Sequence, residues 1–169
     1  MASFTANVGD DYIRQLEALG RDADRVARRA LEESADILAD TMRQNLEGLS
    51  EDIRTSGGKD YYFLTQNEFF AGVPSAEKET LLDHMVVSST RIRHNGDYSV
   101  WIGFEGYDDV QTEAYPGGRP VPMLVNAIEH GTSQRPKQPF IKPAVRSTKD
   151  RVTARIQRII EQETEKVVK

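Results

Sequence analysis

Residues 126–145, "NAIEHGTSQRPKQPFIKPAV", join two segments of helical character and decide the fold prediction for this chain. Glycine is common just beyond a helix C-terminus, so we expect the first helix to end at Gly131 with an αL cap. Proline suits the first turn of a helix, where the N–H that it lacks would have had no partner. We therefore expect the last helix to open near Lys142–Pro143.

The connector between these helices contains three prolines, Pro136, Pro139 and Pro143, which restrict the backbone and remove three hydrogen-bond donors. Phe140 and Ile141 are the only large apolar residues of the turn. Because apolar side chains gain free energy by leaving water, we expect these two to hold the turn against the core. The stretch predicts a rigid elbow rather than a mobile lid.

Helices are predicted on both sides of this elbow. The first covers residues 121–131, "VPMLVNAIEHG", with Pro122 in a first-turn position. The second runs from the elbow almost to the C-terminus, and its apolar residues recur at helical steps. These residues are Val145, Val152, Ile156, Ile159 and Val167.

A long helix is also predicted near the N-terminus, over residues 10–49. At 1.5 Å per residue it would be about 60 Å long, which exceeds an ordinary globular core. Gly20 is its weak point, because glycine costs a helix about 1 kcal/mol relative to alanine. Two shorter helices that meet near Gly20 are the alternative. The apolar or small residues of the predicted stripe are Tyr12, Leu16, Leu19, Ala23, Val26, Ala30, Ile37, Thr41 and Met42.

A β-hairpin is the clearest local signal in the chain. In "VVSSTRIRHNGDYSVWIGF", Asn95-Gly96 lies between two alternating runs, which predicts strands over 86–94 and 97–104 joined by a type I′ turn. A short helix, "SAEKETLLDHM", precedes the hairpin and begins at its predicted cap, Ser75.

Two segments show neither helical nor strand periodicity. Residues 105–120, "EGYDDVQTEAYPGGRP", predict an acidic loop. Residues 50–75 contain a cluster of aromatic residues, which either covers the core of the same domain or forms a contact surface for another subunit. The cluster consists of Tyr61, Tyr62, Phe63, Phe69 and Phe70.

Together these elements predict an α+β fold, in which a long N-terminal helix and a C-terminal helix pack on a small antiparallel sheet that contains the Asn-Gly hairpin. With 169 residues, we expect one domain over 1–169. No apolar run approaches the roughly 18 residues needed to cross a bilayer, and the N-terminus lacks a signal-peptide pattern. The absence of cysteine excludes disulfides and thiolate chemistry, and we expect the protein to stay in a reducing cytoplasm or in a structure assembled there.

The net charge of −5 conceals an asymmetry. Residues 1–85 hold 9 Lys/Arg and 17 Asp/Glu, whereas residues 86–169 hold 13 and 10. The basic residues that flank the apolar stripe of the last helix are Lys142, Arg146 and Lys149 on one side and Arg151, Arg155 and Arg158 on the other. The acidic residues of the long first helix include Asp22, Asp24, Glu32, Glu33, Asp36 and Asp40.

These charges suggest that the last helix has an acidic partner. Positive charge in the N-terminal half of a helix opposes the macrodipole, at a typical cost of about 0.3–1 kcal/mol for each cation. We hypothesise that the basic helix meets an acidic surface of the same or a neighbouring subunit, for example Arg155 with Asp36. An ordinary solvated face is the alternative.

The elbow also resembles a known signature. Its residues are similar to the Glu-x-Gly-Thr … Pro-Phe-x-x-Pro-Ala pattern of a family of tailed-phage neck proteins, the tail-completion or minor tail proteins similar to gene product 10 of phage HK97. The order of predicted elements resembles that family too. Residues 50–75 and 104–120 look like loop insertions beyond the family minimum, so the resemblance transfers least there. The matching residues are Glu129, Gly131, Thr132, Pro139, Phe140, Pro143 and Ala144.

The resemblance implies a non-enzymatic structural protein of the virion, in the neck or tail, that is assembled in the cytoplasm of the host bacterium. It implies a homo-oligomeric ring, hexameric by the symmetry of the tail, that joins the tail to the DNA-filled head. The implied partners are the tail terminator or tail tube protein and a head-completion or stopper protein. Genomic DNA would pass without specific binding, and no cofactor, metal or membrane is implied. For the interface we expect the aromatic cluster together with Arg146, Arg151, Arg155 and Arg158.

A tail terminator or a head-side stopper is the nearest alternative, because neck proteins share small α+β folds and a fold does not fix a function. A nucleic-acid-binding protein is a further alternative. Residues 135–158 contain eight Lys/Arg and a single acidic residue, Asp150, which is a pattern able to follow phosphates. The net negative charge of the whole chain argues against nucleic-acid binding.

An enzyme is disfavoured, because the sequence lacks the residue patterns that catalysis would need. The three histidines, His84, His94 and His130, lack the spacing of metal ligands. Ser88-Ser89 has no nucleophile-elbow context, and the sequence has no P-loop or dinucleotide fingerprint.

Overall fold

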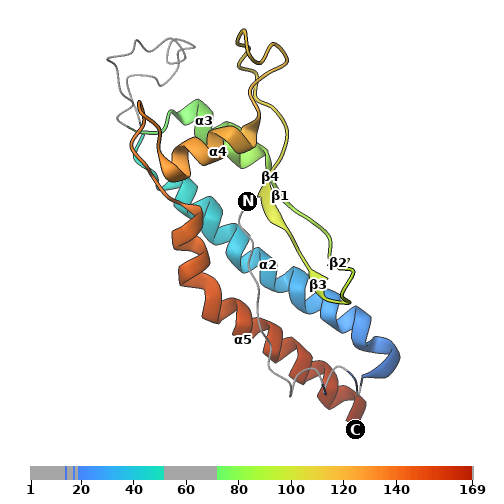
Figure 1. Cartoon of the computed structure of the whole chain (residues 1–169). Coiled ribbons are helices and arrows are strands. Elements are labelled where there is room, and N and C mark those ends of the chain that lie inside the picture. Colours follow the sequence, from blue (N-terminus) through green and yellow to red (C-terminus); the bar gives the residue numbers. More distant parts are fainter. Residues whose placement is uncertain (1–13, 15–16, 18, 52–71, 169) are drawn as a thin grey trace. The chain divides into compact units, whose positions relative to one another are not determined.

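The computed structural model describes residues 14, 17, 19–51 and 72–168 (Figure 1). The chain divides into two compact units, each assembled from separate stretches. The ranges are 42–86 and 103–143 for unit 1, and 2–41, 87–102 and 144–169 for unit 2, of which only the described residues are considered. The prediction of a single domain over the whole chain stays a prediction.

The N-terminal helix is shorter than predicted. Helix α2 extends over Ala23–Glu47, which is 25 residues. A 3₁₀ turn, η1 (Gly20–Asp22), precedes it, and Gly20 has a φ of +54°. Because this φ lies outside the right-handed helical region, an uninterrupted helix over 10–49 is wrong at Gly20, as the two-helix alternative anticipated. Most of the predicted helix before Gly20 lies outside the described residues.

The other three helices occur where they were predicted. Helix α3 is Ser75–Asp83, α4 is Val121–His130, and α5 is Ile141–Val168. The predicted cap of α3 is wrong, because Ser75 is already helical and the residue before it, Pro74, provides no side-chain cap. The helical hydrogen bonds of α3 begin with the N–H groups of Glu77 and Lys78, which donate to the Pro74 carbonyl.

The predicted hairpin is present, but its strands are short and interrupted. They are β1 (Met85–Val87), β2 (Arg91–Ile92), β3 (Tyr98–Ser99) and β4 (Ile102–Phe104). They form two two-stranded sheets, in which β1 pairs with β4 and β2 pairs with β3. In the second sheet Arg91 is opposite Ser99, in antiparallel register.

The turn of the hairpin differs from the type I′ prediction. Gly96 has a φ of +87°, and among the described residues only glycines have a positive φ, so Asn95 lacks the conformation that a type I′ turn requires. The Gly96 N–H donates to the Arg93 carbonyl (2.9 Å), and Arg93 pairs with Asp97 across a three-residue loop. The Asn95 Oδ1 accepts from the Asp97 N–H, a local bond that Asn makes readily in turns.

A bulge separates the two sheets of the hairpin. The Ser88 N–H donates to the Trp101 carbonyl, whereas Arg91 is opposite Ser99, so one strand advances by three residues while the other advances by two. Such an extra residue bends a strand and redirects a side chain. The bulged strand therefore turns Thr90, which is buried, away from the ladder.

Thr90 is held by helix α2 of the same unit. Its N–H and Oγ1 both donate to the Glu32 carboxylate, at 3.1 and 3.0 Å, and its carbonyl accepts from Arg28 at 3.0 Å. The ladder bonds that the bulge leaves unmade are thus replaced by bonds to α2. This contact explains why the predicted strands break where they do.

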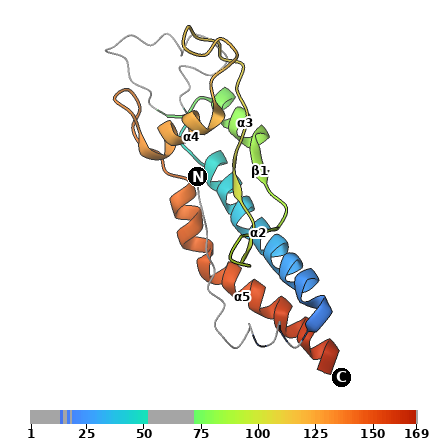
Figure 2. The same cartoon turned by 45° about the vertical axis from the view of Figure 1, so that its right-hand side comes forward.

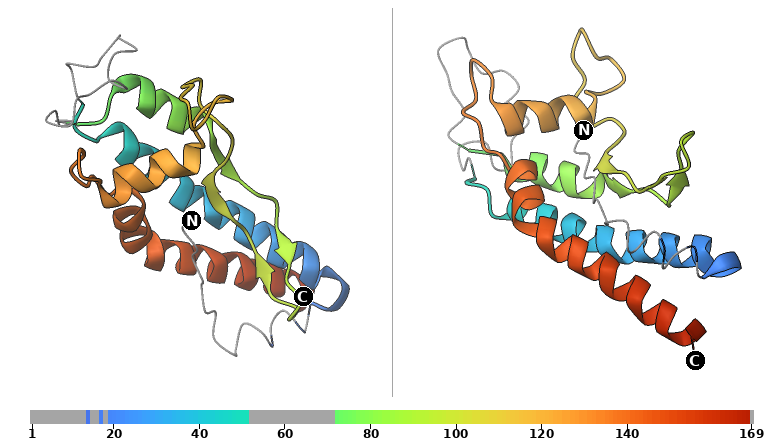
Figure 3. Two further views of the ribbon diagram at one scale, coloured as in Figure 1. Left: turned by 45° about the horizontal axis from the view of Figure 1, so that its top comes forward. Right: turned by 60° about the horizontal axis from the view of Figure 1, so that its bottom comes forward.

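Each unit has its own apolar core, and the α+β prediction is confirmed. In unit 1, where α3 and α4 pack together (Figure 3), the core includes Leu46, Leu81, Phe104, Leu124, Ile128 and Phe140. In unit 2, where α2 and α5 lie side by side (Figure 2), it includes Val26, Ala30, Leu38, Val152, Ile156 and Ile159. None of the described helices is both long enough and apolar enough to span a membrane.

Candidate functional site

The elbow is organised by one buried carboxylate. Glu129 lies near the end of α4 and is 5% exposed. Its Oε2 accepts from the N–H groups of Phe140 (2.8 Å) and Ile141 (3.0 Å), and its Oε1 accepts from the Lys142 N–H (3.0 Å). The first amides of a helix have no intrahelical partner, and negative charge is favourable beside them. Glu129 therefore caps α5 from α4, and Pro143, the next residue, has no N–H to satisfy.

Gly131 follows the last residue of α4, and its conformation sets the direction in which the connector continues. It has a φ of 81° and a ψ of 170°, so the positive φ agrees with the prediction but the αL cap is wrong. This region of φ and ψ is adopted almost only by glycine. A Cβ at this position would lie 2.9 Å from the Lys137 N and 3.0 Å from the Arg135 carbonyl oxygen. The close approach of the connector, as well as the conformation, thus requires glycine.

The remaining residues of the family-like signature surround this cap. Thr132 forms a turn, in which its N–H donates to the Arg135 carbonyl at 2.8 Å. Phe140 is fully buried, and its ring meets that of Phe104 edge to face, with centroids 5.8 Å apart. Ala144 is fully buried, whereas the side chains of the two matching prolines, at 139 and 143, are exposed.

Replacement of Gly131 by alanine tests the conformational argument. We expect Gly131→Ala to lower the free energy of unfolding by about 2 kcal/mol, because the new Cβ meets backbone atoms and the positive φ becomes strained. Urea denaturation followed by circular dichroism measures the loss. Gly117→Ala is the matched control, because a Cβ there meets no atom within 4 Å, and equal losses in the two variants would contradict the argument.

A buried ionic network in unit 1 was missed by the sequence analysis. Glu77 of α3 lies 2.7 Å from Arg135 and 3.3 Å from Arg119, and Arg119 also lies 2.7 Å from Asp108. The four side chains are 1–16% exposed. Buried charges are tolerated when they are paired, and two acids with two arginines balance. The network ties the acidic loop 105–120 and the connector of the elbow to α3.

The aromatic part of the predicted interface cannot be placed, because Tyr61, Tyr62, Phe63, Phe69 and Phe70 lie outside the described residues. The described residues that flank this segment pair with each other. The Val73 N–H donates to the Ser50 carbonyl at 2.8 Å, and Glu51 forms a parallel bridge with Val73.

The four arginines of the predicted interface have different surroundings in the structure. Arg146, Arg151 and Arg158 are exposed, and none of them has an ion-pair partner among the described residues. Arg155 is partly buried and pairs with Glu33 of α2, so its predicted pairing with Asp36 is wrong. Glu33 lies nearly one helical turn before Asp36, on the side of α2 that faces α5 within unit 2.

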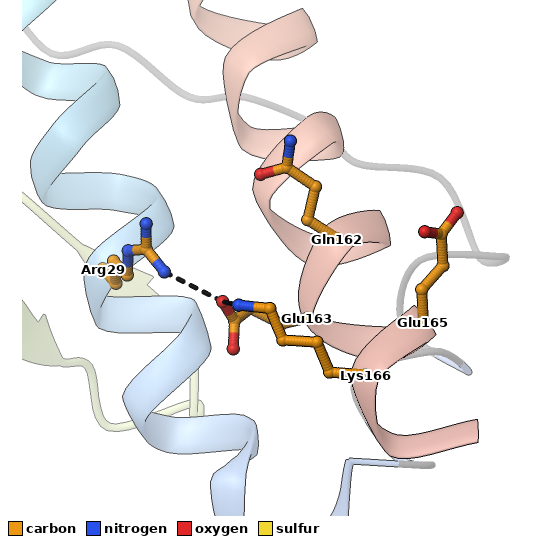
Figure 4. Close-up of a pocket in the computed structure, with 5 residues that line it drawn as sticks. All are labelled: Arg29, Gln162, Glu163, Glu165 and Lys166. Carbon is orange, nitrogen blue, oxygen red and sulfur yellow. Dashed lines mark hydrogen bonds and ion pairs between the residues drawn. The ribbon is translucent and has the colours of Figure 1, made fainter. Parts of the chain in front are cut away.

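A second set of ion pairs joins the same helices with the opposite polarity. Arg29 of α2 donates to Glu163 of α5 at 2.9 Å, and Lys166 pairs with Glu163 within α5 (Figure 4). These residues, with Gln162 and Glu165, line a shallow and open hollow. Its walls are polar or charged side chains, and Arg29, Glu163 and Lys166 pair with one another, so the hollow lacks the apolar enclosure of a small-molecule site.

The interhelical pairs give a pH-dependent prediction. Arg29, and after it Arg155, hold the pKa of Glu33 below its ordinary value of 4.5. A lowered pKa in the folded state contributes stability above the ordinary value, and that contribution is lost as the pH falls through the folded value. In a double-mutant cycle with Glu33→Gln and Arg155→Gln we expect a coupling of about 0.5 kcal/mol at neutral pH, since both groups are about one-third exposed.

Urea denaturation at pH 7 and again near pH 3 measures this coupling. It should become smaller at the lower pH, because protonation of the Glu33 carboxyl group removes the charge that pairs with Arg155. A cycle with Asp36→Asn in place of the Glu33 change is the control and should give no coupling. A coupling that is as large at the acidic pH as at pH 7 would contradict the assignment of this pair.

The residues considered for catalysis have ordinary structural surroundings. His84 Nδ1 lies 2.9 Å from the Thr80 carbonyl oxygen, and His94 and His130 are exposed. Ser88 Oγ accepts from the Trp101 N–H in the hairpin. Within the part of the chain that the structure describes, no group of three His, Asp or Glu side chains is arranged to hold a metal ion.

Comparison with known proteins gives no match: no family model, no curated protein and no solved structure corresponds to this chain.

Proposed function

We propose that this chain is a structural protein of a tailed-phage virion, which completes the tail and joins it to the head as a subunit of a neck ring. The observation that carries the proposal is the Glu129 elbow. Glu129, Gly131 and Phe140 are parts of one construction, in which a carboxylate from α4 caps α5 and a buried ring holds the turn. The resemblance to the tail-completion signature thus falls on residues with interdependent structural roles.

The order of the elements gives further support. A long helix, a short helix, a hairpin, a helix that ends just before Gly131 and a C-terminal helix follow one another as the resemblance implies.

A nucleic-acid-binding function receives less support from the geometry. Within the described parts of the chain, two of the eight basic residues in 135–158 have acidic partners, because Arg135 pairs with Glu77 and Arg155 pairs with Glu33. Arg135 is also 5% exposed. A buried, paired guanidinium is not available to a phosphate, so the basic run is weaker as a phosphate track than its sequence indicates.

The proposal is tested in the genome that encodes the chain. A stop codon in place of Trp101 removes β4, α4, the elbow and α5. Electron micrographs of the lysate should then show DNA-filled heads beside separate tails of normal length. Expression of the intact chain from a plasmid should restore joined particles.

The same micrographs distinguish the alternatives. Overlong tails would identify a tail terminator, and heads that lose their DNA would identify a head-side stopper. Normal infectious particles would refute a role in virion assembly. The control is a synonymous change at the same codon region, which should leave the particles unaltered.

A further inference from the structure

The tip of the hairpin in unit 2 contains a chemically reactive pair of residues. Of the five asparagines in the chain, Asn95 is the one that is followed by glycine. A backbone nitrogen can attack the side-chain amide of a preceding asparagine, and glycine favours this attack because it has no Cβ to obstruct it and a freer backbone. Asn95 and Gly96 are both exposed, and a Cβ at Gly96 would meet no atom within 4 Å. Water and hydroxide therefore reach the pair.

The side-chain amide of Asn95 is polarised by the residue that follows the glycine. Its Oδ1 accepts from the Asp97 N–H at 3.2 Å, and its Nδ2 donates to the Asp97 carboxylate. Attack on the amide carbon places negative charge on Oδ1, where a positioned N–H donor stabilises it. The carboxylate beside Nδ2 favours protonation of the leaving nitrogen. The turn thus contacts both ends of the amide in the way that the reaction needs.

We propose that Asn95 is a modification site, at which the asparagine is converted spontaneously to aspartate and isoaspartate. Hydroxide removes the amide proton of Gly96, and the Gly96 nitrogen then forms a bond to Asn95 Cγ. The bond from Cγ to Nδ2 breaks, and ammonia leaves with a proton from water, which regenerates hydroxide and leaves a cyclic imide. Water opens the imide at Cγ to give aspartate, or at the backbone carbonyl to give isoaspartate. No group is oxidised or reduced, and water is the only reactant that is consumed besides the chain.

The hydrogen bond that must open before the attack lies at the exposed tip. The Gly96 N–H donates to the Arg93 carbonyl at 2.9 Å within the three-residue loop. Such bonds at exposed loop tips open with small free energies. Asn45 and Asn126 lie inside α2 and α4, where the next N–H donates to a carbonyl one turn earlier. The nitrogen that would attack is therefore more available at Asn95 than at either helical asparagine.

The conversion changes the turn in which it occurs. A carboxylate at position 95 replaces the amide that donates to Asp97, so two negative groups face each other. Isoaspartate also lengthens the main chain of the loop that Arg93 and Asp97 close. We expect the turn to loosen while Thr90 stays bound to α2, because the bonds of Thr90 to that helix do not involve the turn.

Peptide mapping of the purified full chain by mass spectrometry tests the proposal. After incubation at mildly alkaline pH, position 95 should hold a mixture of aspartate and isoaspartate, and isoaspartate forms only through the cyclic imide. Asn95 should convert at least about tenfold faster than Asn45 or Asn126, whose following N–H groups are bonded within helices. Gly96→Ala should slow the conversion at least about tenfold, because the new methyl group obstructs the attack.

Two further variants separate the reaction from effects on folding. Asn95→Gln keeps an amide on a longer side chain, so the same ring cannot form and position 95 should not convert. Gly117→Ala makes the glycine replacement in another exposed loop and should leave the conversion of Asn95 unchanged. In the converted protein, isolated by ion-exchange chromatography, the Arg93 N–H should exchange with deuterium at least about tenfold faster, whereas the Thr90 N–H should exchange as before.

Three outcomes would overturn the inference. The first is an Asn95 that converts no faster than Asn126, and the second is a product that contains aspartate without isoaspartate. The third is a conversion that occurs in urea but not in the folded chain, which would mean that the folded turn prevents the attack. The inference does not depend on the proposed function, because the reaction requires only the turn and water.

Discussion

Glu129→Ala is expected to lower the free energy of unfolding by about 4 kcal/mol, because three amide groups at the start of α5 lose a charged acceptor in a buried place. The alanine variant no longer has to bury a carboxylate, and this gain partly offsets the loss of free energy of unfolding. Glu129→Gln keeps one acceptor oxygen and should lose about half as much. Urea denaturation of both variants measures these values.

Hydrogen exchange gives this prediction a local readout. The amide protons of Phe140, Ile141 and Lys142 should exchange at least about tenfold faster in Glu129→Ala than expected from the loss of global stability alone. Glu105→Ala removes an exposed carboxylate from the same unit and should change stability by less than about 0.5 kcal/mol. Unchanged protection of the three amides would show that Glu129 does not cap α5.

Glu77→Gln is expected to lower the free energy of unfolding by about 3 kcal/mol. Arg135 would then lie beside a neutral side chain at a position that is 5% exposed, and removal of the acidic member of a buried ion pair is strongly destabilising. Arg119 keeps its pair with Asp108, so the loss comes mainly from Arg135. The loop 105–120 and the connector of the elbow should loosen together, since both are tied to α3 by this residue.

A double replacement separates the charge from the packing. Glu77→Met with Arg135→Met removes one anion and one cation, and it should be less destabilising than Glu77→Gln alone, because an apolar pair of similar volume carries no buried charge. A double variant that is as unstable as the sum of its single variants would mean that packing, and not charge pairing, maintains this contact. Thermal and urea denaturation supply the comparison.

The family-like residues were predictable because their roles are local. A glycine that ends a helix and a proline that begins one act through the backbone conformation of a few neighbouring residues. Phe140 is the only Phe, Tyr or Trp in residues 126–145. The role of Glu129 was less accessible. Glu129 was recognised as part of the family-like signature, but its role as a cap was not. The N–H groups that donate to it lie eleven to thirteen residues later in the sequence, and neither helical nor strand periodicity predicts a contact at that separation.

Other features depended on partners that the local pattern does not contain. The interruption of the hairpin at Thr90 requires Glu32, which lies 58 residues away on α2. Arg135 was counted among cations available to an external partner, whereas it is buried against Glu77. The hairpin itself was evident from Asn95-Gly96, but its turn type was not, because a three-residue loop needs only the glycine at positive φ.

The sequence by itself determined the helical segments, the place of the hairpin, the elbow and the uneven charge of α2 and α5. Each of these follows from periodicity, backbone preference or composition, which act over a few residues. Only the tertiary structure decided which charges are buried in pairs, which are exposed, and which carboxylate caps α5. The physical reason is that the free energy of a charge is set by the groups brought around it and by its distance from water, and folding brings those groups from remote parts of the chain.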